Sequence, residues 1–224
     1  MKILLSAYAC EPHRGSEPGN GWNTAYYLAL RGHDVQVLTR IASKEIIQNE
    51  LNRLSMPNLR FHFVDVPKIQ KYFIKGQIGV YLHYLSWQHE AYKYAGKLVD
   101  DIDIIHHRTW GSLHGGSELW KFSKPLLWGP IGGGQIAPTA LLRYFEGNLY
   151  LELLRSLTTF LFWLFYPSAG NAARKSFLVL ASNRETRDKL LNIKTCNVLL
   201  HPDLSLENDF IPIQYPTRTA NSKL

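Results

Sequence analysis

The sequence predicts an α/β fold, a Rossmann-like open parallel sheet flanked by helices. Short apolar runs, typical of strands covered on both faces, alternate along the chain with longer segments whose apolar residues recur at helical spacing. Such alternation is typical of a parallel sheet with helices on both faces. The chain has 224 residues, 46% of them hydrophobic, which is enough for one large domain with a full core.

The first half of the chain supplies three of the predicted strands. Residues 2–7 (KILLSA) form a continuous apolar run, and the helical pattern at 21–31 ends at Gly32, a residue suited to the left-handed end of a helix. The pattern then predicts a strand at 34–39, a helix at 43–54, a strand at 59–66, and a mostly helical, aromatic-rich segment at 69–99 that is interrupted near Gly76 and Gly79.

The second half continues the same alternation. We expect residues 1–201 to form the Rossmann-like domain, and the weakly periodic, proline-containing residues 202–224 to form a linker or tail. Strands are predicted at 103–107, 125–128, 177–181 and 197–200, and helices at 117–122, 138–165 and 184–191.

Charge and cysteine content narrow the classes of partner. A formal net charge of +7 and an isoelectric point near 9.4 favour an anionic partner. The lysines and arginines are scattered, so no nucleic-acid partner is expected. Cys10 and Cys196 lie far apart without CxxC spacing, which argues against a disulfide or zinc site and favours a reduced, cytoplasmic protein. Tyr8 disrupts a signal-peptide cleavage site, so the apolar start is interpreted as a buried strand.

Three unusual stretches follow predicted strands. They are YACEPHRGSEPGNGW (8–22), HHRTWGSLHGG (106–116) and WGPIGGGQ (128–135). Ligands of open parallel sheets bind beyond the carboxyl ends of the strands. We therefore expect the three stretches to converge on one rim of the sheet.

The glycines of these stretches have two interpretations. Gly15, Gly19 and Gly21 either allow tight turns or let backbone N–H groups at 19–22 face an anion or a sugar hydroxyl. A dinucleotide fingerprint is not met, because Thr24 stands where its third glycine belongs. For Gly132, Gly133 and Gly134 the ligand-contacting interpretation is favoured, because three successive glycines lose much conformational entropy on folding.

His106 and His107 end a predicted strand, where successive side chains point to opposite faces. One is expected to face the ligand cleft and the other to pack against a helix, and the sequence leaves open which is which. A metal site is not expected, because neighbouring strand residues cannot easily chelate one ion and no cluster of Asp, Glu or Cys accompanies them.

The segments MKILLSAYACEPHRGSEPGNGW, DIIHHRTW and LLWGPIGGG closely resemble the N-terminal domain of GT-B-fold glycosyltransferases of family 4, the group 1 retaining enzymes. The resemblance covers roughly residues 1–200. It implies one half of a GT-B fold, in which two Rossmann-like domains face each other across a cleft. The N-terminal domain mostly binds the acceptor, and the C-terminal domain holds the nucleotide-diphosphate sugar.

The resemblance also implies roles for particular residues. The loop matching 15–21 approaches the phosphate and sugar of the donor, and Glu17 and Asn20 are expected to hydrogen-bond donor or acceptor hydroxyls. His107 or His106 matches a histidine near the transferred sugar. Trp110 ends the second motif, and the GPIGGG turn matches a loop that lines the cleft floor. The implied partners are a nucleotide sugar and a glycan or lipid-linked acceptor, with no metal or other cofactor.

One departure from the family concerns its Glu-x7-Glu motif, which lies in the C-terminal domain. No two glutamates of this sequence have that spacing. We therefore expect residues 202–224 to lead toward a missing donor-binding domain, and we expect no transfer by this chain alone, because the leaving diphosphate lacks a cradle.

Two alternatives come from other classes. Residues 157–166 (LTTFLFWLFY), with Arg143 and Arg155 nearby, are too short to span a bilayer, but they suit either a core helix or peripheral contact with an anionic membrane. A nucleotide-sugar epimerase or dehydrogenase is disfavoured, because neither Tyr72 nor Tyr92 precedes a lysine by four residues and the dinucleotide fingerprint is incomplete.

Overall fold

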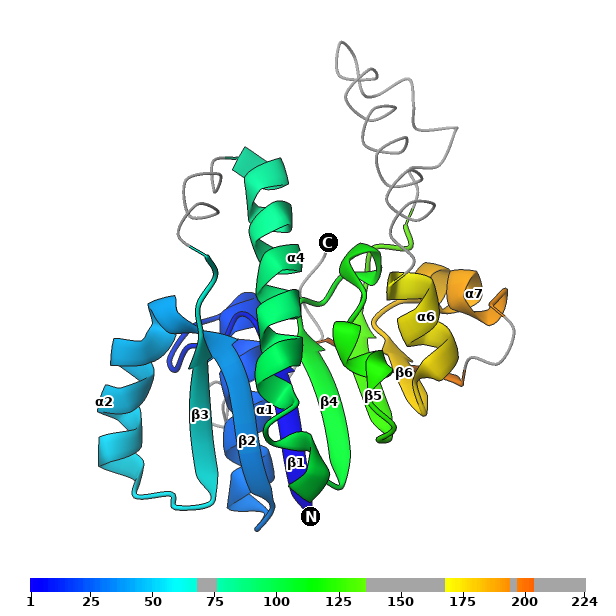
Figure 1. Cartoon of the computed structure of the whole chain (residues 1–224). Helices are drawn as coiled ribbons and strands as arrows, with labels where there is room; N and C mark the ends of the chain where they lie inside the picture. The colour runs from blue at the N-terminus through cyan, green and yellow to red at the C-terminus, as the bar shows by residue number, and fades with distance from the viewer. Residues whose placement is uncertain (68–75, 136–167, 194–196, 204–224) are drawn as a thin grey trace, which may run out of the picture.

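The computed structural model describes residues 1–67, 76–135, 168–193 and 197–203. These residues contain a seven-stranded, all-parallel sheet with the strand order β3-β2-β1-β4-β5-β6-β7. Helices cover both faces, with α4 and α6 in front of the sheet and α1 behind it (Figure 1). The predicted α/β fold class is therefore confirmed.

The strands lie close to their predicted positions. The strands are β1 (Lys2–Ala7), β2 (Asp34–Arg40), β3 (Leu59–Val64), β4 (Ile104–Thr109), β5 (Leu126–Ile131), β6 (Leu178–Ala181) and β7 (Val198–Leu200). The α-helices are α1 (Ser16–Leu30), α2 (Lys44–Leu54), α4 (Gly76–Ala95), α6 (Ser168–Lys175) and α7 (Arg184–Leu191), and short 3-10 helices cover Ile41–Ser43 (η1), Val99–Asp101 (η2), Leu113–Gly115 (η3) and Glu118–Lys121 (η4).

The core lies on both faces of β1. Leu4 packs with Tyr84 and Trp87 of α4 on one face, whereas the next residue, Leu5, packs with Trp22 of α1 on the other. Successive side chains of a strand point to opposite faces, so both sets must be apolar when both faces are covered. This arrangement accounts for the continuous apolar run at the start of the sequence.

The chain reverses its direction of winding beside β1. From β1 it moves outward through β2 to β3, and it then returns to place β4 on the other side of β1. Such a reversal opens a crevice at the carboxyl ends of the two central strands, where ligands of open α/β sheets bind. In Figure 1 these strand ends lie at the upper edge of the sheet.

The helices differ from the prediction in several places. Helix α1 begins at Ser16 rather than at residue 21, α4 continues through Gly79 without interruption, and α6 was not predicted. The helix predicted at 117–122 is a short 3-10 helix, η4 (Glu118–Lys121). Glycine disfavours helices by about 1 kcal/mol in propensity alone, but tertiary packing overrides so small a preference. The predicted helical segments 69–75 and 138–165 lie outside the described residues.

Close packing explains why α1 contains glycines near its start. A Cβ atom on Gly21 would collide with the carbonyl oxygen of Ala9, and one on Gly19 would collide with the carbonyl oxygen of Arg14. Both obstacles are backbone atoms, which cannot rotate away. Gly19 was expected in a loop and Gly21 at the first residue of the helix, but both lie inside α1, where they allow the start of the helix to lie directly against the segment that follows β1.

We predict that Gly21→Ala lowers the free energy of unfolding by about 1–3 kcal/mol, the usual cost of overpacking. Helix propensity alone would change stability in the opposite direction by about 1 kcal/mol, so the sign identifies the cause. Urea unfolding followed by circular dichroism measures the effect. Gly15→Ala is the matched control, because a Cβ there meets nothing within 4 Å. Equal stability of the two variants would contradict the packing argument.

Candidate functional site

A hollow of about 380 Å³ lies at the reversal between β1 and β4. Two segments that are distant in sequence meet there, the start of α1 and the loop that follows β4. The lining residues are Ser16, Glu17, Asn20, Trp110, Gly111, Ser112 and Asp203. The first two of the three unusual stretches therefore converge on one rim, as the sequence predicts.

The third stretch joins the same rim through its backbone. The N–H of Gly132 donates to the carbonyl of Gly111 at 2.8 Å, and the N–H of Leu113 donates to the carbonyl of Gly132 at 2.9 Å. These bonds attach the loop after β5 to the loop after β4, which lines the hollow. The glycines at 132–134 themselves are not among the lining residues.

The local structure requires glycine at two of these three positions. Gly133 adopts φ +90°, a left-handed conformation that favours glycine. Gly134 lies against the start of α7, where its N–H donates to the Thr186 hydroxyl at 3.0 Å and an added Cβ would collide with the Thr186 backbone. For Gly133 and Gly134 the entropy cost of glycine therefore no longer requires a ligand as its explanation.

Glu17 is the carboxylate of the first stretch, and it points to the loop after β4. Its Oε1 accepts a short hydrogen bond from the N–H of Gly111. Burial raises the pKa of the Glu17 carboxyl, and the nearby Asp203 adds to that effect, while the Gly111 bond and the charge of Arg108 oppose it. Glu17 therefore holds its proton to a higher pH than an exposed glutamate does.

Arg108 lies beneath the hollow, at the end of β4. Its Nε donates to the Thr24 hydroxyl at 3.1 Å, and its Nη1 donates to the Asp203 carboxylate at 2.8 Å. The amide of Asn20 donates to the Asp203 carbonyl at 2.8 Å. Residues from α1, β4 and the segment after β7 are thus held together around one guanidinium.

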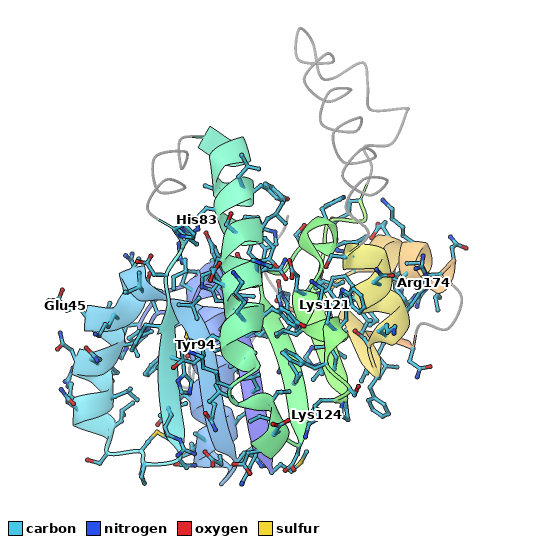
Figure 2. All side chains as sticks on the ribbon, in the orientation of Figure 1. Glu45, His83, Tyr94, Lys121, Lys124 and Arg174 are labelled. Carbon is cyan, nitrogen blue, oxygen red and sulfur yellow. The ribbon has the colours of Figure 1, made fainter. Side chains whose placement is uncertain are left out.

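Trp110 supplies an aromatic wall. Its ring stacks on the ring of Tyr84, with 4.7 Å between the ring centroids. The rings of Tyr81 and Tyr8 meet it edge-on, at centroid distances of 4.9 Å and 5.7 Å. The Tyr8 hydroxyl is in turn 2.9 Å from Nδ1 of His83, which Figure 2 labels on the upper part of α4. An apolar wall beside a few polar groups is the usual composition of a small-molecule site.

The two histidines point to opposite faces, as predicted, and neither lines the hollow. His106 pairs with Leu5 on the α1 face, and its Nε2 donates to the Gly129 carbonyl at 2.8 Å. Nε2 of His107 is 3.2 Å from the Tyr84 hydroxyl on the α4 face. Burial lowers the pKa of His106 to about 4 and that of His107 to about 3, so both rings are neutral at pH 7.

Sequence reasoning missed five members of this region: Ser16, Arg108, Gly111, Ser112 and Asp203. Arg108 carried a usable signal, since a charged residue near the end of an apolar strand needs a partner. Asp203 carried none, because it stands in the segment that was expected to be a linker. Its position depends on contacts with residues far away in the sequence.

Other features of the described residues lie apart from this rim. A second hollow, of about 460 Å³, lies at the amino ends of the strands and includes Lys2, Asp34 and Lys124. Within the described ranges, no group of three or more His, Cys, Asp or Glu side chains is placed to hold a metal ion. No described helix is long and apolar enough to cross a membrane. Residues 157–166 lie outside the described residues.

Comparisons with known proteins add little about function. No protein-family model and no curated protein matches the chain. Among solved structures, the chain is similar to the crystal structure of Glycyrrhiza uralensis UGT73P12 complexed with glycyrrhetinic acid 3-O-monoglucuronide, with 12% identity and a TM-score of 0.47. The match covers 89% of this chain and 48% of that one, so the chain spans about half the length of that protein. Nothing about this chain is inferred from so distant a similarity, and the fold is assigned from the seven-stranded parallel sheet.

We predict that the buried histidines make the protein less stable as the pH falls from 6.5 to 5. The unfolded chain takes up protons near pH 6.5, whereas His106 and His107 in the folded chain do so only near pH 4 and 3. Stability therefore falls by about 1.4 kcal/mol per pH unit for each such histidine below pH 6.5. Urea unfolding at several pH values should show a shallower slope for His106→Gln and for His107→Gln. Asn52→Gln, a change without a titratable group at an exposed position of α2, is the control and should keep the wild-type slope.

We also predict that Glu17→Gln stabilises the protein at pH 7, by about 0.5–1 kcal/mol. A carboxyl whose folded pKa is raised favours the folded state below its unfolded pKa and loses that contribution as the pH rises through the folded pKa. Glutamine keeps an oxygen acceptor for the Gly111 N–H and removes the charge. The gain should shrink at pH 4, where glutamate also becomes neutral. A loss of stability at pH 7 would contradict this account.

Proposed function

We propose that this chain is the acceptor-side domain of a retaining, family-4 glycosyltransferase with a GT-B fold. In this proposal a sugar passes from a nucleotide-diphosphate sugar to a glycan or lipid-linked acceptor. The observation that carries it is the hollow at the β1/β4 reversal, because residues of two family-like motifs, 8–22 and 106–116, line it together. The doubly covered parallel sheet is the scaffold that such a domain requires.

The lining groups suit a sugar-bearing substrate. Glu17 and Ser16 offer oxygens that can hydrogen-bond sugar hydroxyls. Trp110 offers an aromatic surface against which the apolar side of a substrate can pack. The proposed role of the first stretch is thus to hold polar groups at the rim, with α1 as a rigid support.

The histidines act as positioning residues in this proposal. His106 connects β4 to the Gly129 carbonyl, and His107 lies against Tyr84, so each holds the strand end that leads to Trp110. Both rings are neutral at pH 7, and we assign neither a general-base role. In the proposed reaction the departing diphosphate assists an oxocarbenium-like transition state, and no metal takes part.

The cytoplasm is the proposed location, with peripheral contact of residues 157–166 at the inner face of the membrane as a further part of the hypothesis. Only the sequence supports this part, through the apolar character of that segment and the basic net charge of the chain.

Binding of sugars to the whole chain tests the proposed function. Saturation-transfer NMR with a panel of nucleotide sugars, monosaccharides and oligosaccharides should find a ligand class whose affinity falls about tenfold or more in Trp110→Ala, which corresponds to at least about 1.4 kcal/mol. Lys124→Ala, at the opposite end of the sheet (Figure 2), should bind as the wild type does. Circular dichroism checks that both variants are folded. Absence of any sugar ligand, or equal losses in the two variants, would refute the proposal.

A further inference from the structure

Arg108 is the one charged side chain that is buried in the described part of the chain. Its side chain is only 6% exposed. A buried charge is strongly unfavourable unless a partner of opposite charge and hydrogen bonds compensate for it. Among the described residues, Asp203 is its carboxylate partner within salt-bridge distance.

Asp203 presents one carboxylate oxygen and one main-chain carbonyl oxygen to these donors. Its carboxylate accepts from Arg108 Nη1 at 2.8 Å, and its carbonyl accepts from Arg108 Nη2 at 3.3 Å and from the Asn20 amide at 2.8 Å. Two oxygens of one residue are therefore held by donors from β4 and α1. Its side chain remains 40% exposed, and it lines the hollow.

The Arg108 guanidinium has a second partner besides Asp203. The Thr24 hydroxyl accepts from Arg108 Nε at 3.1 Å and donates to the Asn20 carbonyl at 2.8 Å, which links the guanidinium to α1. Asn20 itself is buried in the first part of that helix. Arg108 and Asn20 therefore present their donors from two regular elements, β4 and α1, whereas Asp203 belongs to a segment without regular structure.

We propose that Arg108 and Asn20 form a binding site for a phosphate group at the β1/β4 reversal, and that Asp203 occupies this site in the free protein as an intramolecular substitute. An incoming phosphate would take over the bonds to the guanidinium and the amide, and both the carboxylate and the main-chain carbonyl of Asp203 would move away from these donors. A guanidinium binds phosphate and carboxylate oxygens with the same forked geometry, so the exchange leaves no buried charge unpaired.

Glu17 moderates the affinity of this site. An added Cβ on Gly111 would lie 3.5 Å from Glu17 Oε1 and 3.7 Å from Asp203 Oδ2, so both carboxylates face the same loop. A bound phosphate would be repelled by an ionised Glu17. Glu17→Gln should therefore strengthen phosphate binding, which separates this inference from the sugar-binding role, where the same change removes an ionised acceptor.

Calorimetric titration of the whole chain with sodium pyrophosphate, at constant ionic strength, tests the proposal. Asp203→Asn keeps the shape of the occupant and removes its charge, so its affinity for pyrophosphate should exceed that of the wild type by about tenfold or more. Adding Arg108→Lys to this variant should abolish the gain, because lysine lacks the forked donor pair. Arg53→Gln, an exposed site on α2, is the control for nonspecific attraction.

The outcomes are distinct. Equal affinity of Asp203→Asn and the wild type would overturn the proposal, as would a loss in Arg53→Gln as large as that in the Arg108 variant. Should the Arg108 variant fail to fold, the comparison of Asp203→Asn with the wild type still decides. Tighter binding of UDP than of pyrophosphate would assign the phosphate to a nucleotide, and tighter binding of geranyl diphosphate would assign it to a lipid. Neither result depends on sugar transfer. The glycosyltransferase proposal can therefore be refuted without refuting the phosphate site.

Discussion

The burial of β1 on both faces is the constraint on which the rest of the structure depends. Leu4 and Leu5 belong to two separate cores, so helices must cover the sheet in front and behind. Crossovers between parallel strands are right-handed, so the reversal of winding beside β1 places α1 and α4 on opposite faces. Because β2 and β4 both pair with β1, the chain reverses beside this strand and leaves the hollow at its carboxyl end.

The close approach of α1 to the segment after β1 converts that crevice into a defined site. Gly19 and Gly21 let the start of the helix lie against backbone carbonyls, so Glu17 and Asn20 reach the rim from a rigid element. Side chains held by a helix keep their positions better than side chains on a free loop. Each glycine lowers helix stability by about 1 kcal/mol in propensity, but a residue with a Cβ could not make this close approach.

The three basic side chains at the end of β4 differ in how they avoid the cost of a buried charge. His106 and His107 avoid the cost of burial by remaining neutral, whereas Arg108 cannot lose its proton and must be paired. The region therefore holds one fixed positive charge between two carboxylates, those of Glu17 and Asp203. An anionic ligand group can therefore bind this guanidinium only in place of the Asp203 carboxylate, as proposed above.

The sequence by itself determined the strands and the edge at which the site lies, because burial on both faces requires local apolar runs and parallel strands present their carboxyl ends together. Residues 2–7 match β1 for this reason. Only the tertiary structure decided the start of α1, the face that each histidine occupies, and the pairing of Arg108 with Asp203 across 95 positions of the chain. Those features depend on contacts between distant segments, and the spacing of neighbouring residues carries no information about them.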